Sequence, residues 1–189
     1  YTPNDLKMEN GGVLLEDALK RILLNYKEKK ADLVTHSMGG LISRTYINDL
    51  SKDSSNNIIY YQNNVRSLVM IGTPNYGSHL ANNCLDSPVM CWITTILGLT
   101  NNGPAIHDLA VGSTLTFNLY KTGLKPGINY LVITGINHDL VDIPFLESED
   151  SDSVVSASSA SLLNIGLPLI LIKANHDTEH GNCHIGLGD

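Results

Sequence analysis

Positive charge is scarce in this sequence, and no basic cluster stands out. The chain has 189 residues, of which 12 are Lys or Arg and 19 are Asp or Glu. Its formal net charge is therefore -7, and its pI is about 5.4. Proteins that bind nucleic acids neutralise the phosphates with clustered Lys and Arg side chains. This composition therefore disfavours a nucleic acid as the partner.

Long apolar segments are also missing. No uninterrupted run approaches the roughly 20 apolar residues that a membrane-spanning helix needs. The longest run, near residues 165–172, contains Gly166 and Pro168, and we expect it to form a buried strand. The first five residues show no signal-peptide pattern.

Cysteine is rare, with residues only at positions 84, 91 and 183. An odd number argues against a full disulfide framework. Cys84 and Cys91 are close enough in sequence to pair around a short loop, which would indicate an oxidising compartment. Three unpaired thiols are the alternative. We expect a secreted or cell-envelope location rather than a cytoplasmic one.

The hydrophobic pattern indicates an α/β fold. Hydrophobic residues make up 42% of the chain, which fits a single globular domain over residues 1–189. Helices are predicted at 12–29 and 38–50, and strands at 31–35, 65–71, 129–136 and 167–173. Residues 76–126 are expected to form irregular helices over the sheet, and 51–57 a polar loop. This alternation predicts a mostly parallel sheet with helices on both faces.

The segment Thr35-His36-Ser37-Met38-Gly39-Gly40 lies between a predicted buried strand and a predicted helix. A nucleophile elbow has this context, because a sharp strand-to-helix turn lifts the Ser hydroxyl above the sheet. Residues two before and two after the Ser must be small. Gly39 satisfies this requirement, whereas Thr35 replaces the usual Gly. The alternative for Ser37 is an ordinary helix N-cap.

Several segments together resemble bacterial lipases and esterases of the α/β-hydrolase superfamily. The resemblance rests on the elbow and its helix, on Ile71-Gly72-Thr73-Pro74-Asn75-Tyr76-Gly77-Ser78, and on segments 108–119, 151–159 and 184–187. It implies an α/β-hydrolase fold and a Ser–Asp–His hydrolase that acts on acyl esters. Ser153 departs from the family pattern, in which Gly follows the acid.

The acid and the base follow from chain order and from this resemblance. A Ser hydroxyl needs a His base that is oriented by a carboxylate, and in α/β-hydrolases the order is Ser, acid, His. Asp152 is the predicted acid because it lies between the third and fourth strands; Asp150, Glu149 and Asp142 compete with it. His184 is the predicted base, with His176 second. Residues 147–161 are rich in Ser and acidic residues, so a solvated linker is the alternative for this stretch.

The remaining histidines do not predict a metal site. His36, His79, His107 and His138 are interpreted as structural or surface residues. His176, His180 and His184 recur every fourth residue, which on one helix would suggest metal ligands. Gly181 and Asn182 interrupt such a helix, so neither a metal nor a cofactor is expected.

The first oxyanion donor is predicted to be the Met38 amide. The second normally comes from a loop after an earlier strand, and no such strand precedes the helix at 12–29. Only five residues follow His184, so the usual last helix is also missing. We therefore expect a fold that lacks its N-terminal strands and last helix, either because the sequence is a piece of a longer protein or because that part of the fold is supplied otherwise.

Residues 79–120 are expected to form a cap-like insertion. Within it, Trp92, Ile93, Ile96 and Leu97 would offer an acyl-binding or lipid-interface surface, with ordinary core packing as the alternative. The predicted function is hydrolysis of carboxylic esters, including lipid esters, through an acyl-enzyme. The alternatives are a thioesterase, amidase or acyltransferase with the same triad, or a non-catalytic binding module. The expected partner is a small ester or lipid, and the oligomeric state is left open.

Overall fold

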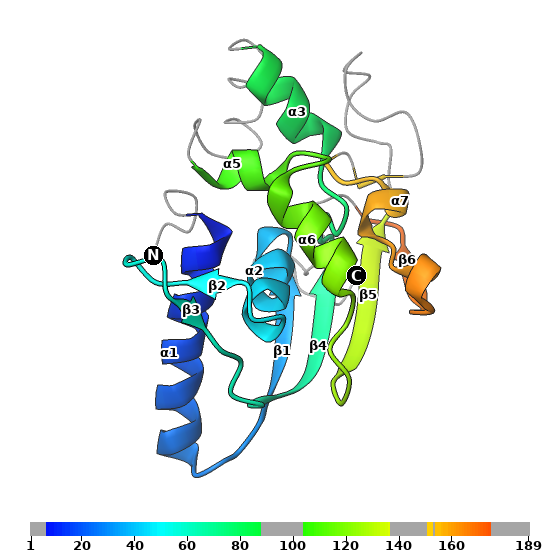
Figure 1. The fold of residues 1–189 in the computed structure, drawn as a ribbon. Coiled ribbons are helices and arrows are strands. Elements are labelled where there is room, and N and C mark those ends of the chain that lie inside the picture. The colour runs from blue at the N-terminus through cyan, green and yellow to red at the C-terminus, as the bar shows by residue number, and fades with distance from the viewer. Residues whose placement is uncertain (1–6, 88–103, 137–150, 153, 175–189) are drawn as a thin grey trace, which may run out of the picture.

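In the computed structural model, the chain forms a parallel sheet with helices packed against it (Figure 1). The structure describes residues 7–87, 104–136, 151–152 and 154–174. The helices are α1 (Met8–Tyr26), α2 (Met38–Ile47), α3 (His79–Asp86), α5 (Pro104–Leu109), α6 (Thr114–Thr122) and α7 (Ala157–Ala160), with a 3-10 turn η2 (Leu163–Ile165). The strands are β1 (Ala31–His36), β2 (Ser51–Lys52), β3 (Ile58–Ile59), β4 (Val65–Ile71), β5 (Asn129–Gly135) and β6 (Leu169–Ile172).

The four long strands form one parallel sheet in the order β1-β4-β5-β6. Its register places His36 beside Ile71, Ile71 beside Ile133, and Ile133 beside Ile170. All four strands therefore end at one edge of the sheet, which we call the carboxyl edge; it lies at the top of Figure 1. The predicted α/β fold with a mostly parallel sheet is confirmed.

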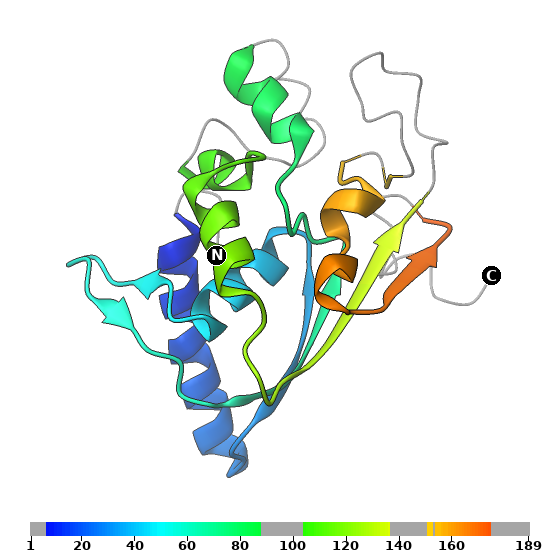
Figure 2. The same ribbon diagram turned by 45° about the vertical axis from the view of Figure 1, so that its right-hand side comes forward.

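Helices α1, α2 and α6 lie on one face of the sheet, whereas α3 and α5 lie above its carboxyl edge (Figure 2). One buried cluster joins Leu19 of α1 and Tyr46 of α2 to Leu68 and Met70 of β4 and Val132 of β5. On the opposite face, Val34 of β1 is 70% exposed and Ile170 of β6 is 44% exposed. Helix cover on both faces thus stays an expectation.

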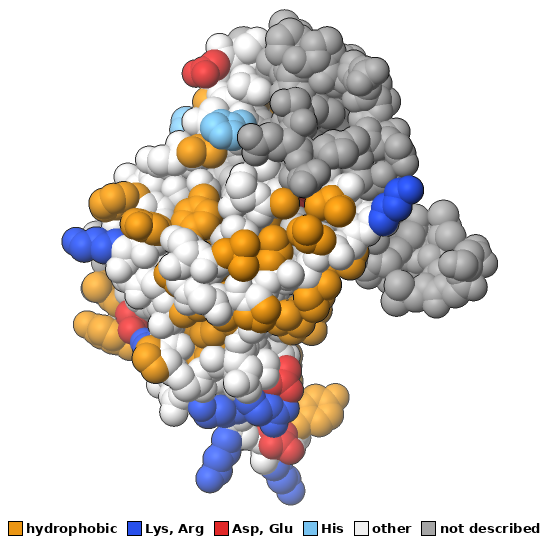
Figure 3. Space-filling view, turned by 90° about the vertical axis from the view of Figure 1, so that its right-hand side faces the viewer, with side chains coloured by type: hydrophobic (Ala, Val, Ile, Leu, Met, Phe, Trp, Pro, Cys, Tyr) orange, Lys and Arg blue, Asp and Glu red, His pale blue; other side chains and the backbone are white. Residues whose placement is uncertain are grey.

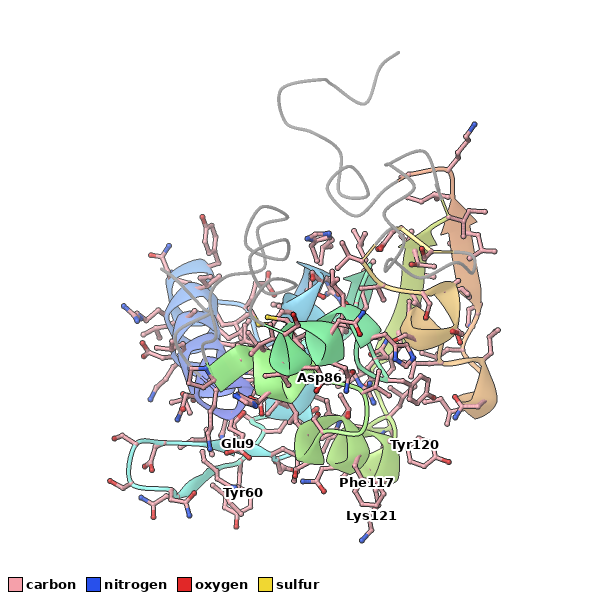
Figure 4. All side chains as sticks on the ribbon, turned by 90° about the horizontal axis from the view of Figure 1, so that it is seen from above. Glu9, Tyr60, Asp86, Phe117, Tyr120 and Lys121 are labelled. Atoms are coloured by element: carbon pink, nitrogen blue, oxygen red, sulfur yellow. The ribbon has the colours of Figure 1, made fainter. Side chains whose placement is uncertain are left out.

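Helix α6 belongs to the helix layer. Leu115 and Leu119 are buried in a cluster that also contains Leu41 of α2. Seen from above the carboxyl edge in Figure 4, Phe117 and Tyr120 point outward from α6, and both are more than half exposed. The predicted cap at 79–120 contains α3, α5 and most of α6. The helices expected within residues 76–126 are therefore present. The cap assignment itself stays a prediction.

Charge gathers at the end of the molecule opposite the carboxyl edge. Figure 3 shows Lys and Arg side chains there, where α1 ends and β1 begins. The basic residues of that stretch are Lys27, Lys29 and Lys30.

No helix in the described part of the chain is long and apolar enough to cross a membrane.

The start of α1 corrects the sequence prediction. The helix begins at Met8 rather than at residue 12, and it includes both Gly11 and Gly12. A Cβ on Gly11 would lie 3.1 Å from Ile42, and one on Gly12 would lie 3.0 Å from the Cβ of Ser51. These glycines therefore permit close packing of α1 against α2 and β2 instead of ending the helix.

Two polar segments also differ from expectation. Residues 51–57, predicted as a loop, hold strand β2, which pairs with β3 through a turn where Asp53 accepts the N–H groups of Ser55 and Asn57. The solvated-linker alternative for 147–161 is wrong where the structure describes the stretch. Ser151, Asp152 and Ser156 are buried, and Ser156 caps α7.

Candidate active site

Ser37 occupies a strained turn between β1 and α2. Its backbone has φ 50° and ψ -127°, a conformation that non-glycine residues rarely adopt. Its N–H donates to the carbonyl of Ile71 at the end of β4 (2.8 Å), and its carbonyl accepts the N–H of Gly40 (3.1 Å). Backbone strain of this kind concentrates at functional sites, where the surrounding structure holds it in place. The turn therefore has the form of a nucleophile elbow.

Small residues around the turn allow its close packing. A Cβ on Gly40 would lie 2.6 Å from Cγ2 and 2.9 Å from Cβ of Thr73, so only glycine fits without displacing the neighbouring loop. A Cβ on Gly39 would meet the Cβ of Thr35 at an ordinary 3.6 Å. Thr35 itself is accommodated because its hydroxyl donates to the carbonyl of Val69 (3.0 Å). The closest approach is thus at Gly40, one residue later than the sequence pattern suggested.

Asp152 lies in the segment between β5 and β6, which we call the acid segment (151–152 and 154–161). The residue is fully buried, and its Oδ1 accepts the N–H groups of Val154 (2.9 Å) and Val155 (2.6 Å). Backbone donors of this kind stabilise and orient a carboxylate. One oxygen is therefore fixed by the turn.

Hydrogen bonds connect the acid segment to the loop after β4. The N–H of Tyr76 donates to the carbonyl of Ser159 (3.2 Å), and the hydroxyl of Ser78 donates to the carbonyl of Val154 (3.0 Å). The same loop follows Ile71, whose carbonyl holds the N–H of Ser37. Ser37 and Asp152 therefore belong to adjoining segments at the carboxyl edge of the sheet.

The other predicted site residues fall into two groups. Met38 is the first residue of α2, where the N–H groups of a helix have no acceptor within the helix. His36 ends β1, and His79 and His107 are exposed on α3 and α5. Several predictions lie outside the described residues: His138, His176, His180, His184, Trp92, Ile93, Ile96, Leu97, Ser153, and the competing acids Asp142, Glu149 and Asp150.

Cys84 on α3 is buried and disulfide-bonded. Cys91, its predicted partner, and Cys183 lie outside the described residues. Within the described part of the chain, no group of three or more His, Cys, Asp or Glu side chains could hold a metal ion.

Sequence comparison assigns a family. Residues 9–129 match the profile of a domain of unknown function, DUF7379. The chain belongs to this family. No curated protein matches the DUF7379 chain significantly in sequence.

Solved structures of lipases share the fold of the DUF7379 chain. The mature lipase BlEst2 of Bacillus licheniformis superposes with a TM-score of 0.69 at 21% identity, over 93% of this chain and 69% of the lipase. In the propeptide form of the same lipase, the superposition spans only 38% of the lipase chain. Phospholipase PlaB of Legionella pneumophila gives a TM-score of 0.61 at 18% identity, over 84% of this chain and 35% of the phospholipase. These superpositions show a shared α/β-hydrolase fold, and at such low identity they show the fold alone.

Two buried residues of the DUF7379 chain were not predicted as site residues. Arg44 of α2 donates to the side chain of Asn75, and Asn75 donates to the carbonyl of Ala160 in the acid segment. Both residues lie in segments that carried the family resemblance. The only local sign of their role in the sequence is that each is a polar residue with apolar residues nearby, and this pattern does not predict that Arg44 and Asn75 contact each other.

Proposed function

We propose that this chain is a serine hydrolase that cleaves carboxylic esters, with Ser37 as the nucleophile. The observation that carries the proposal is the backbone of Ser37, held at φ 50° between a parallel strand and a helix. An ordinary N-cap serine has extended backbone and needs no such strain. The strained turn is the feature that presents a Ser hydroxyl to substrate in α/β-hydrolases.

In the proposed mechanism, the Ser37 hydroxyl attacks the acyl carbonyl while His184 accepts its proton. The N–H of Met38 donates to the oxyanion that forms. His184 then protonates the departing alcohol, leaving an acyl-Ser37 ester. Water attacks this ester with His184 as base, which releases the carboxylic acid and restores Ser37. Asp152 orients the imidazole and stabilises its protonated form.

We further propose an acyl ester of a lipid as the substrate class. The fold neighbours include a lipase and a phospholipase, so lipid esters are the first compounds to test. Trp92, Ile93 and Leu97 remain the proposed acyl-binding residues, within a cap at 79–120. A location outside the reducing cytoplasm is supported by the disulfide at Cys84, because disulfides persist in oxidising compartments.

Labelling with a fluorophosphonate tests the nucleophile. We expect the wild-type chain to be labelled and to hydrolyse p-nitrophenyl butyrate, and Ser37→Ala to lose both properties, with a fall in kcat of at least about 10⁴-fold. Ser55→Ala, on the exposed turn between β2 and β3, is the matched control and should behave as wild type. Label on Ser37→Ala, or a folded wild-type chain that takes no label, would contradict the proposal. Ester, thioester and amide substrates with one acyl chain would then define the leaving group.

A further inference from the structure

Arg44 is a buried cation that no described carboxylate neutralises. It lies about two helical turns after Ser37 on α2, and only 1% of the residue is exposed. None of the ion pairs within the described residues includes it. Burial lowers the pKa of Arg44 to about 10, which still leaves the guanidinium charged at neutral pH. An apolar side chain of similar volume would be less costly to bury, so packing alone does not account for this residue.

The hydrogen bonds of Arg44 are directed to two other elements. Its Nη1 donates to Oδ1 of Asn75 (2.8 Å), and its Nη2 donates to the carbonyl of Leu119 on α6 (3.0 Å). Helix α2, which directly follows Ser37, is thereby fixed both to the loop after β4 and to α6. A planar guanidinium holds two acceptors in a defined orientation, which a Lys ammonium does not.

Asn75 extends this connection to the acid segment. Its side chain is fully buried, and its Nδ2 donates to the carbonyl of Ala160 (2.7 Å). An amide oxygen only accepts and an amide nitrogen only donates, so these two bonds determine the orientation of the side chain. A continuous buried path therefore runs from α2 through Asn75 to the segment that carries Asp152.

We propose that Arg44 and Asn75 are positioning residues that set the acid segment relative to the helix of Ser37. The proposal rests on the proposed function, because it assigns Asp152 and Ser37 to one reaction. Neither residue needs to touch the substrate. Their effect on catalysis would come from geometry, since small misplacements of reacting groups cost up to about 100-fold in rate.

Two substitutions break the path at different points. Asn75→Asp keeps an acceptor for Arg44 but removes the donor to Ala160, whereas Arg44→Met keeps the bond from Asn75 to Ala160. We expect each to lower kcat for p-nitrophenyl butyrate at least tenfold while KM changes less than about twofold. Arg44→Lys should recover part of the loss seen in Arg44→Met, because it restores the charge and one donor. The matched controls are Arg66→Met on the exposed end of β4 and Asn48→Asp at the end of α2; both should retain wild-type kcat.

Hydrogen exchange of the acid segment separates this proposal from the proposed function. In Asn75→Asp, amides of residues 154–161 should exchange at least tenfold faster than in wild type, while amides of α1 are unchanged. If the wild-type chain hydrolysed no ester, this result would still show that Asn75 holds the acid segment in place, and only the proposed function would fail. Unchanged exchange, or a kcat within twofold of wild type in Asn75→Asp, would overturn the proposal. If Arg44→Met does not fold, the exchange and kcat of Asn75→Asp alone test the positioning role.

Discussion

At the scale of single residues, the turn at Ser37 depends on the backbone strain of Ser37 itself and on the absence of a side chain at Gly40. Ser37 adopts a backbone conformation with positive φ, and Gly40 lets the loop after β4 approach α2 closely. The strain at Ser37 has to be offset by the surrounding contacts, among them the bond from its N–H to the carbonyl of Ile71. Stability and the proposed catalysis are therefore connected through the same turn.

Gly40→Ala should destabilise the protein by about 1–3 kcal/mol, the usual cost of forcing an extra methyl group into a packed site. The new Cβ would lie 2.9 Å from the Cβ of Thr73. Gly39→Ala is the matched control: its Cβ has an ordinary contact, and Ala has the higher helix propensity, so its stability should equal or exceed that of wild type. Urea unfolding measures both variants. Equal stabilities for Gly39→Ala and Gly40→Ala would show that the approach of Thr73 does not constrain residue 40.

At the scale of elements, the first turn of α1 is held from a distant part of the chain. The N–H of Met8 donates to Oδ2 of Asp108 on α5 (3.0 Å). The N-cap residue Lys7 provides no side-chain cap, so this carboxylate takes over that role. Burial raises the pKa of Asp108, and the bond from Met8 acts in the opposite direction. The helix start thus depends on α5 being in place.

Asp108→Ala should therefore fray the first turn of α1 and cost about 0.5–2 kcal/mol, as the loss of an N-cap does. Asp108→Asn keeps an acceptor oxygen but loses the negative charge at the helix N-terminus, so a smaller loss is expected. Hydrogen exchange of residues 8–12 and urea unfolding measure the two effects. Asp86→Ala, at the exposed end of α3, serves as control. Unchanged exchange of residues 8–12 in Asp108→Ala would contradict this account of capping.

Elements whose pattern is local were predicted well from the sequence. Strand 65–71 was predicted with its observed bounds, and the strand at 129–136 ends one residue earlier. The start of α1 was missed because Gly11 and Gly12 are used for packing against partners far along the chain.

The candidate site shows the same division. The turn at Ser37 was predicted from a local motif, and Asp152 was chosen from its position between the third and fourth predicted strands and from the family resemblance. The bond between Arg44 and Asn75 joins residues 31 positions apart, and no periodicity reports such a contact. The burial of the Ser-rich acid segment was missed for a related reason, because its hydroxyl groups are satisfied within the fold and at the α7 cap.

At the scale of the whole molecule, three tyrosines connect the helix layer to the sheet. Tyr46 of α2 donates to Oδ1 of Asn64 (2.9 Å), and its ring meets Tyr61 edge to face at 5.4 Å. Tyr130 of β5 donates to the carbonyl of Lys125 (3.3 Å). Burial raises the pKa of all three hydroxyls, and that of Tyr130 reaches about 12. Ionisation would place a negative charge in the core at Tyr46, or in a half-buried position against the core at Tyr61 or Tyr130.

The free energy of unfolding should consequently fall as pH rises above about 10. In the unfolded chain the tyrosines lose their protons near pH 10, whereas in the folded chain Tyr130 keeps its proton to about pH 12, so the unfolded state binds fewer protons in this window. Arg44 acts in the opposite sense, because its pKa is lowered to about 10 on folding, and it offsets the contribution of Tyr130 in this window. The net decline therefore comes from Tyr46 and Tyr61, whose pKa values are also raised by burial.

Urea unfolding between about pH 8 and 11.5 would measure this decline, and absorbance at 295 nm would follow tyrosinate formation. Tyr130→Phe should flatten the pH dependence, because it removes a tyrosine whose pKa the fold raises to about 12. Tyr120→Phe changes an exposed ring on α6 and should leave the slope as in wild type. If wild-type stability were equal at pH 9 and pH 11, these tyrosines would not be held neutral by the fold. The packing between the helix layer and the sheet would then accommodate ionised tyrosines, contrary to what the burial of their hydroxyl groups predicts.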